Sequence, residues 1–215
     1  MPMRLFSIAG FSRRGVLAAL AAALVLVAPP ARADDLAVGA QKFVETLADD
    51  AIGALTQPDV PRDERINRFR TLFNDRFAVR AIGRHILGRH WRDTTPAQQE
   101  EYFTLFEDLM VVSYVDRFAR YTGDKLTIVR TRADSDQYAT VFSQFKADTG
   151  AKPVAVDWRI GKAKDRYFVM DVVVAGASMS GSLKSQFASI IKSSGNGIDG
   201  LLTELRQNTE SMRAQ

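Results

Sequence analysis

The two histidines of the chain, His85 and His90, lie five positions apart in a polar stretch. Three acids follow them closely, namely Asp93, Glu100 and Glu101. Such side chains could bind a metal ion or transfer protons. Five residues turn a helix by about 500°, so the two imidazoles would lie about 140° apart even on an unbroken helix. Gly88 also stands between them. The spacing therefore favours helix ends and a solvated face, and we expect no metal here.

A second candidate for chemistry is the sequence GASMSG at 176–181, which follows a strand-like run. This is where a nucleophile elbow of pattern G-x-S-x-G would lie, but Ser180 occupies the place of its last glycine. Asp171 lies nearby, yet no histidine follows to activate a serine. The chain has no cysteine, which excludes thiol catalysis and cysteine-bound metals. We therefore expect a protein that is not an enzyme and needs no cofactor.

The elements that would position these residues follow from the hydrophobic pattern. Apolar residues recur at helical spacing over 36–55, 60–73, 75–88, 96–121, 182–191 and 197–207. Strand-like runs cover 126–132, 137–146, 153–160 and 166–175. The turns between these runs are short, so neighbouring strands should pair antiparallel. The pattern predicts an α+β fold in which helices precede and follow a four-stranded antiparallel sheet.

The first 33 residues have the pattern of a secretory signal peptide. Arginines precede an apolar run over 16–27, and the segment ends in an A-x-A site at 31–33. The run is shorter than the roughly 20 residues that span a membrane. Residues 12–17 also resemble a twin-arginine export signal, while Sec export of the same peptide stays open. We expect cleavage near Ala33, a single domain over 34–215 and a periplasmic location.

The excess of positive charge belongs to this predicted signal peptide. The chain has 29 basic and 25 acidic residues, and four of the basic residues but none of the acids lie in 1–33. Residues 34–215 therefore carry equal numbers of both. Because no basic field remains to attract phosphates, nucleic-acid binding loses its main driving force. We expect no nucleic-acid partner.

Two ordered blocks of residues resemble the MlaC/toluene-tolerance family of periplasmic phospholipid-binding proteins. The first block comprises Leu87-Gly88-Arg89, Trp91, Thr95-Pro96-Ala97-Gln98, Tyr102-Phe103, Phe106, Tyr114 and Tyr121-x-Gly123. The second comprises Val154-x-Val156-Asp157-Trp158, Asp171, Gly176-x-Ser178-Met179, Phe187 and Gly197-Ile198-Asp199-Gly200-Leu201-Leu202. No single motif is specific, but the ordered set covers nearly all of 34–215. The hopanoid-associated HpnM proteins are a closely similar branch.

The resemblance implies a strongly curved sheet of cystatin/NTF2-like type, with N-terminal and C-terminal helices enclosing an apolar cavity. It also implies that the protein binds the acyl chains of a phospholipid and carries it through the periplasm. The implied partners are an inner-membrane ABC transporter with a ring of MCE domains and an outer-membrane lipoprotein–porin complex. We expect a monomer in this role.

On this basis we expect the cavity between the apolar face of the third strand and the aromatic stripe of the long helix, capped by 176–187. The expected lipid-binding residues are Phe106, Met110, Tyr114, Phe118, Phe142, Val154, Val156, Trp158, Val172, Val174, Ala177, Met179 and Phe187. The chain departs from the family pattern at Ala177, where a larger aliphatic residue is frequent, and at Lys184, where arginine is frequent.

Three alternatives stay open. A polycyclic lipid of hopanoid type could replace the phospholipid. An enzyme on an NTF2-like cone would need a carboxylic acid kept neutral in an apolar pocket. Asp157 and Asp171 are its candidates, although strand alternation turns Asp157 away from Trp158. A protein that binds partners without any lipid is the third alternative.

Overall fold

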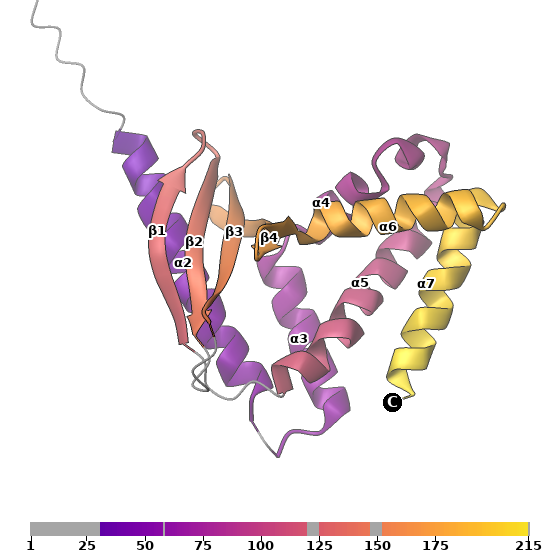
Figure 1. The fold of residues 1–215 in the computed structure, drawn as a ribbon, viewed down its shortest axis with the longest axis horizontal. Helices are drawn as coiled ribbons and strands as arrows, with labels where there is room; N and C mark the ends of the chain where they lie inside the picture. Colours follow the sequence, from indigo (N-terminus) through magenta and orange to yellow (C-terminus); the bar gives the residue numbers. More distant parts are fainter. Residues whose placement is uncertain (1–30, 58, 120–124, 147–151, 215) are drawn as a thin grey trace, which may run out of the picture. The chain divides into compact units, whose positions relative to one another are not determined.

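The computed structural model describes residues 31–57, 59–119, 125–146 and 152–214, except the side chains at 31–33, 117–119, 125 and 146. In this part of the chain, helices precede and follow one antiparallel sheet, as Figure 1 shows. The α+β class predicted from the sequence is thereby confirmed. Residues 1–30 of the predicted signal peptide lie outside the described residues. Positions 120–121, the predicted end of the long helix, also lie outside them.

The helices begin and end close to the residues that the sequence indicated. In chain order they are α2 (Ala31–Leu55), α3 (Arg62–Arg76), α4 (Val79–Leu87), the 3-10 helix η1 (Gly88–Asp93), α5 (Pro96–Ala119), α6 (Met179–Ser193) and α7 (Gly197–Arg213). α5 starts with a capping box, in which the Gln98 N–H donates to Thr95 Oγ1 (3.2 Å) and the Thr95 N–H donates to Gln98 Oε1 (2.9 Å). Gly88 ends α4 at φ 56°, a conformation that favours glycine.

The sheet contains one strand more than predicted. Its strands are β1 (Lys125–Ala133), β2 (Tyr138–Lys146), β3 (Val154–Ala163), β4 (Arg166–Val174) and β5 (Ala177–Ser178). They pair antiparallel in the order of the chain. β5 has two residues, too few to show any alternation, so the sequence pattern could not reveal it. It folds back onto β4 within the segment that was expected only to cap the cavity.

Helix α2 covers one face of the sheet, as the ribbon in Figure 1 shows. The helix buries a stripe of apolar residues, namely Leu36, Ala40, Val44 and Leu47. The sheet contributes Ala139, Val141, Ile160 and Val169 to the same cluster. A Cβ at Gly39 would collide with the hydroxyl of Tyr167, so glycine at this position lets α2 approach β4 closely. We call this cluster the sheet core.

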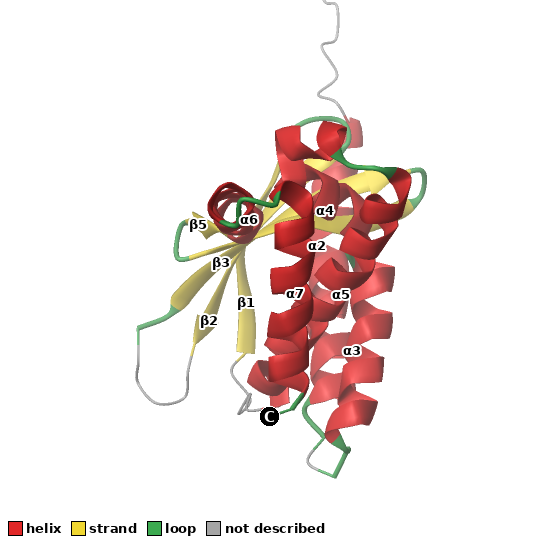
Figure 2. Ribbon diagram, turned by 90° about the vertical axis from the view of Figure 1, so that its right-hand side faces the viewer, coloured by secondary structure: helices red, strands yellow, loops and turns green. Residues whose placement is uncertain are grey.

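The other helices pack around α5 to form a second cluster, the helical core (Figure 2). Tyr102, Phe106 and Val111 of α5 are fully buried there. The Tyr102 hydroxyl donates a hydrogen bond to the carbonyl of Gly83 (3.0 Å). Burial raises the pKa of Tyr102, so its phenol stays neutral and able to donate.

The last turns of α3 and the connection to α4 join the two cores. Phe77 and Leu72 pack against both clusters. The Phe77 N–H donates to the carbonyl of Phe73 (2.9 Å) at the end of α3, and the Ala78 N–H donates to the carbonyl of Val169 (3.0 Å) in β4. The bond to Val169 belongs to an isolated parallel β-bridge between Phe77 and Val169. We call the boundary between the two cores the seam, and Phe77 lies on it.

Candidate functional site

An apolar pocket of about 80 Å³ lies between the second half of α2 and the sheet. Its lining residues are Leu47, Ala48, Ala51, Ile52, Thr56, Phe77, Leu126, Phe145 and Trp158. None of them is charged, and Thr56 is the only hydroxyl residue in this set of described residues. We call this pocket the α2 chamber.

A second apolar pocket, of about 40 Å³, lies between β4 and the helices α3 to α6. Its lining residues are Phe73, Phe77, Ile82, Phe106, Met110, Met170, Asp171, Val172, Met179, Ser180 and Leu183. We call it the β4 chamber. Val172 of this chamber lies directly opposite Trp158 of the α2 chamber across β3 and β4. Directly opposed residues point to the same face of a sheet, so the two chambers meet at this pair, whereas Asp171 of the β4 chamber points to the other face.

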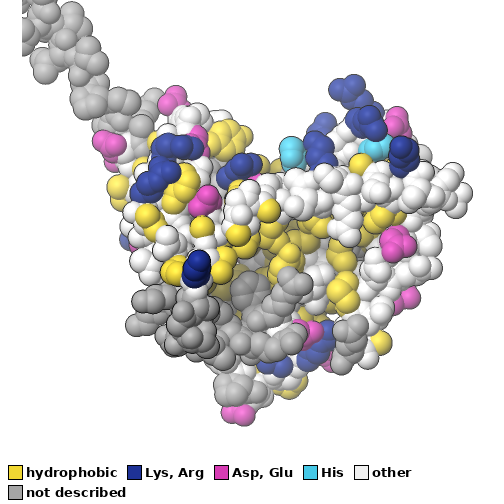
Figure 3. Space-filling model, viewed as in Figure 1, with side chains coloured by type: hydrophobic (Ala, Val, Ile, Leu, Met, Phe, Trp, Pro, Cys, Tyr) yellow, Lys and Arg dark blue, Asp and Glu magenta, His cyan; other side chains and the backbone are white. Residues whose placement is uncertain are grey.

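A third pocket, of about 360 Å³, opens between α5, α6 and α7. It shares Met110 and Leu183 with the β4 chamber, so the three pockets follow one another across the molecule. Its lining also includes polar side chains, among them Gln186 and Asn208. Figure 3 shows hydrophobic side chains gathered between the sheet and the helices, beneath α6. These pockets form a candidate site for a ligand with long apolar parts.

The structure brings part of the predicted lipid-binding set together along these pockets. The β4 chamber contains Phe106, Met110, Val172 and Met179. The α2 chamber contains Trp158. The third pocket contains Met110, Tyr114 and Phe187. The aromatic stripe of α5 therefore faces β4 and α6, not the third strand as expected.

Five other predicted residues, whose side chains are described, do not line the three pockets. Phe142 lies on the sheet face opposite Trp158, where the guanidinium of Arg130 stacks over its ring at 3.6 Å. The backbone of Phe118 is part of α5, but its side chain lies outside the described residues. The other four residues belong to strands. Val156 is buried, whereas Val154, Val174 and Ala177 are exposed. The expected floor of β3 residues is thus reduced to Trp158.

Sequence reasoning missed the residues that α2 and the α3–α4 connection supply. An amphipathic pattern shows that a helix has an apolar face, but not which surface it covers. A signal for Phe77 was nevertheless present. Phe69, Phe73 and Phe77 follow one another at four-residue spacing, which places them on one side of a helix. Extending the stripe of α3 by one turn would have pointed to Phe77.

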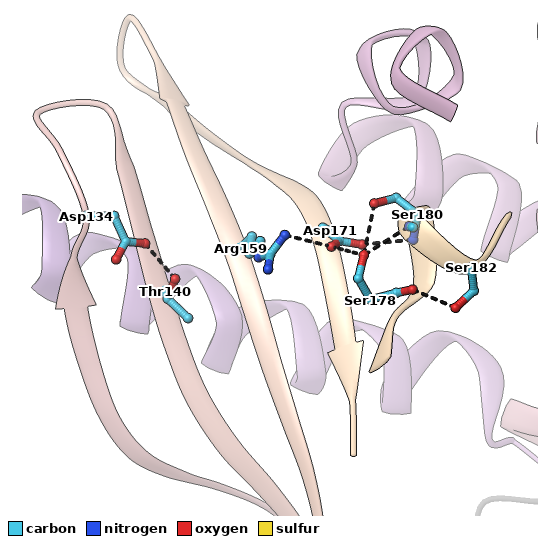
Figure 4. Close-up of polar contacts among 8 residues, drawn as sticks. Asp134, Thr140, Arg159, Asp171, Ser178, Ser180 and Ser182 are labelled. Atoms are coloured by element: carbon cyan, nitrogen blue, oxygen red, sulfur yellow. Dashed lines mark hydrogen bonds and ion pairs between the residues drawn. The ribbon is translucent and has the colours of Figure 1, made fainter. Parts of the chain in front are cut away.

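Asp171 is a buried carboxylate that ties β4 to the start of α6, as Figure 4 shows. Ser178 Oγ donates to its Oδ2 (2.6 Å), the Ser180 N–H donates to its Oδ1 (3.0 Å), and Arg159 Nη1 donates to Oδ2 (3.3 Å). Ser178 Oγ in turn accepts from the Gly181 N–H and so caps α6. No imidazole takes part in this network among the described residues. The GASMSG segment therefore has the contacts of a structural joint and lacks those of a nucleophile elbow.

The two histidines lie on different elements, His85 in the last turn of α4 and His90 in η1. Within the described ranges, no group of three His, Cys, Asp or Glu residues could hold a metal ion. His85 instead borders an open hollow of about 720 Å³, which also contains Arg80, Arg84 and Arg92. A hydrogen bond from Arg80 lowers the pKa of the Glu100 carboxyl at its edge. Figure 3 shows Lys or Arg side chains and histidine gathered on the part of the surface formed by α4 and η1.

The fold and the pockets define a class of protein. It is an α+β domain in which helices cover an antiparallel sheet and apolar pockets follow the seam between them. None of the helices in the described ranges combines the length and the apolar character needed to cross a membrane. The chain belongs to the MlaC protein family, whose model matches residues 45–207.

Two known proteins illustrate this membership. The intermembrane phospholipid transport system binding protein MlaC of Haemophilus influenzae is 26% identical over 129 residues, a match that spans 59% of this chain and 59% of that relative. A phospholipid-binding protein of Ralstonia solanacearum, solved in complex with a phospholipid, has a TM-score of 0.70 and 26% identity, covering 81% of this chain and 98% of the other. Neither is named as an enzyme. The family resemblance seen in the sequence is confirmed.

Proposed function

We propose that this protein is a periplasmic lipid carrier that holds the acyl chains of a phospholipid along the seam. The observation that carries this proposal is the pair of neighbouring chambers with mainly apolar linings, which share Phe77 and meet at Trp158 and Val172 of the sheet. The names of the two relatives support it, since both are described as phospholipid-binding or phospholipid-transport proteins. The described residues hold no charged cluster inside the chambers, which suits a ligand whose head group stays in water.

The energetics of lipid extraction favour an enclosed site over a surface groove. Each methylene that leaves a bilayer for water costs about 0.8 kcal/mol, so roughly 30 methylenes need on the order of 24 kcal/mol of replacement burial. Burial of this extent requires contact on most sides of the chains. The seam offers such contact, because sheet, α2 and the helical core surround it.

The chambers must widen to take up a lipid. Their volumes of about 80 and 40 Å³ are far below the roughly 300–1,000 Å³ of typical ligand pockets. Phe77 and Leu72 contact both cores, so widening would have to rearrange the side chains along the seam.

Export and partners complete the proposal. The signal-peptide pattern of residues 1–33 would place the protein in the periplasm. There it would exchange lipid with an inner-membrane ABC transporter carrying MCE domains and with an outer-membrane lipoprotein–porin complex, the partners that the family resemblance implies. No metal or cofactor is needed for this activity.

A block of the α2 chamber tests the proposal. Ala48 lines this chamber, so Ala48→Trp should fill it and lower lipid uptake about tenfold, a loss of about 1.4 kcal/mol. Delipidated protein would be incubated with vesicles of phosphatidylglycerol and phosphatidylethanolamine, separated from them and analysed for bound lipid. The unfolding free energy should fall by less than the about 1–3 kcal/mol typical of overpacking a closed core.

Val38→Trp provides the matched control, because Val38 lies on the same helix but is 69% exposed and lines neither chamber. It should take up lipid as the wild type does. Normal uptake by Ala48→Trp would show that acyl chains do not use the α2 chamber.

A further inference from the structure

Phe77 occupies a special position in the seam. Among the described residues that line the two chambers, it is the one common to both. Its ring packs against that of Phe73, with ring centroids 4.9 Å apart, and it contacts both cores. Even so, Phe77 is only half-buried, because it borders open space on the sides of the two chambers.

The backbone around Phe77 is held by hydrogen bonds, whereas its ring is held by packing alone. The hydrogen bonds to Phe73 and Val169 hold the main chain between α3 and β4. The side chain makes no hydrogen bond and has a pocket on each side, so a change of rotamer meets less resistance than in a close-packed core. An aromatic ring held in this way separates the two chambers, and rotation of its side chain would connect them.

The two chambers meet on the sheet. Trp158 in the α2 chamber and Val172 in the β4 chamber are directly opposed on neighbouring strands. Side chains opposed in this way have Cβ atoms about 4.5–5.5 Å apart, so the two are direct neighbours on the sheet. Because these two residues are neighbours on the sheet, side chains separate the chambers at this point, and Phe77 borders both chambers.

We propose that Phe77 is the partition that makes this cavity fit a forked, two-chain lipid. This inference rests on the proposed lipid-carrier function. One acyl chain lies along α2 over Trp158, the other lies beneath α5 and α6 over Val172, and the ring of Phe77 stands in the fork. A rigid fused-ring lipid needs an undivided slot of the same volume. The partition therefore selects against such lipids.

Competition between two ligands measures this selection. Delipidated protein is mixed with equimolar dioleoyl phosphatidylglycerol and diplopterol, a fused-ring triterpenoid, and native mass spectrometry gives the ratio of the two bound lipids. The wild type should hold mainly phosphatidylglycerol. Phe77→Ala removes the partition and should shift the ratio toward diplopterol about tenfold, equivalent to about 1.4 kcal/mol.

Phe168→Ala is the matched control, because Phe168 is a half-buried phenylalanine on β4 that lines neither chamber. It should keep the wild-type ratio. If Phe77→Ala is unfolded by circular dichroism, Phe77→Leu replaces it, and its shorter side chain should still shift the ratio in the same direction. A folded Phe77 variant with the wild-type ratio would overturn the partition.

Failure of the partition and failure of the proposed function give different results. If the wild type and Phe168→Ala bind lipid and a folded Phe77 variant binds it in the same ratio, the carrier function stands and the partition is wrong. If the wild type binds neither lipid, the carrier function itself is wrong, and the partition with it.

Discussion

At the scale of single residues, Asp171 fixes how α6 leaves the sheet. Its two carboxylate oxygens accept hydrogen bonds from a serine hydroxyl, a backbone N–H and an arginine, and its side chain is almost fully buried. The β4 chamber includes Asp171 and Ser180 at its edge. The position of the apolar residues that follow, Met179 and Leu183, therefore depends on this one carboxylate.

Replacement of this carboxylate should destabilise the fold. Asp171→Asn keeps the shape but loses the charge-assisted bonds from Ser178 and Arg159, and we expect the free energy of unfolding to fall by about 1–3 kcal/mol. Urea denaturation followed by circular dichroism measures the difference. Asp157→Asn on the neighbouring strand, whose side chain is half-buried, should change it by less than about 0.5 kcal/mol. Equal effects of the two variants would contradict this role of Asp171.

Single residues were also where the sequence was least informative about the site. Alternation correctly placed Trp158 on the apolar face of β3, but it could not show that Val156 on the same face is buried without lining any of the three pockets. Phe142 is apolar and lies in a central strand, yet its ring is on the other face beneath Arg130. The residue type alone cannot distinguish an aromatic ring that stacks with a cation from one that contacts a lipid, because both require an exposed aromatic side chain.

At the scale of elements, the outer helices are held together by ion pairs across the helical core. Arg62 at the start of α3 reaches Asp116 of α5 (3.0 Å) and the carbonyl of Met212 in α7 (2.8 Å). The hydrogen bond with Asp116 raises the pKa of Arg62, so the guanidinium stays charged. A cation at the carbonyl end of a helix also complements its macrodipole. This one side chain therefore joins three helices.

Loss of this link should loosen the helical core. Arg62→Met keeps the apolar stem and removes the charged bonds, and we expect the free energy of unfolding to fall by about 1–2 kcal/mol. Arg68→Met in the same helix removes only the exposed pair with Glu64, four residues away, and should cost less than about 0.5 kcal/mol. The two variants would be compared by chemical denaturation. A smaller effect at Arg62 than at Arg68 would show that the contacts with α5 and α7 contribute no stability.

The elements themselves were largely predictable. Long periodic segments gave α2, α5 and four of the strands to within a few residues, because periodicity over many residues averages out local exceptions. β5 was missed because two residues carry no period. The pairing of α2 with the sheet was missed for a different reason, since packing between elements far apart in the chain leaves no trace in either sequence alone.

At the scale of the whole molecule, the chain builds two cores where an ordinary domain of this size has one. The sheet core and the helical core meet along a seam that contains small apolar chambers, and Phe77 and Leu72 contact both sides. A protein selected only for stability would fill such spaces, because empty volume in a core reduces stability. For this reason the proposed carrier function assigns the acyl chains to the seam.

The most direct test of this account is native mass spectrometry of the wild-type protein, purified from bacterial periplasm without detergent. The account predicts a non-covalent complex of one chain with lipid, which releases a phospholipid on collisional activation, and it predicts that Ala48→Trp from the same preparation carries much less. A spectrum in which the wild type appears only at the mass of the bare chain, or in which both proteins carry lipid equally, would contradict the assignment of the seam as the lipid site.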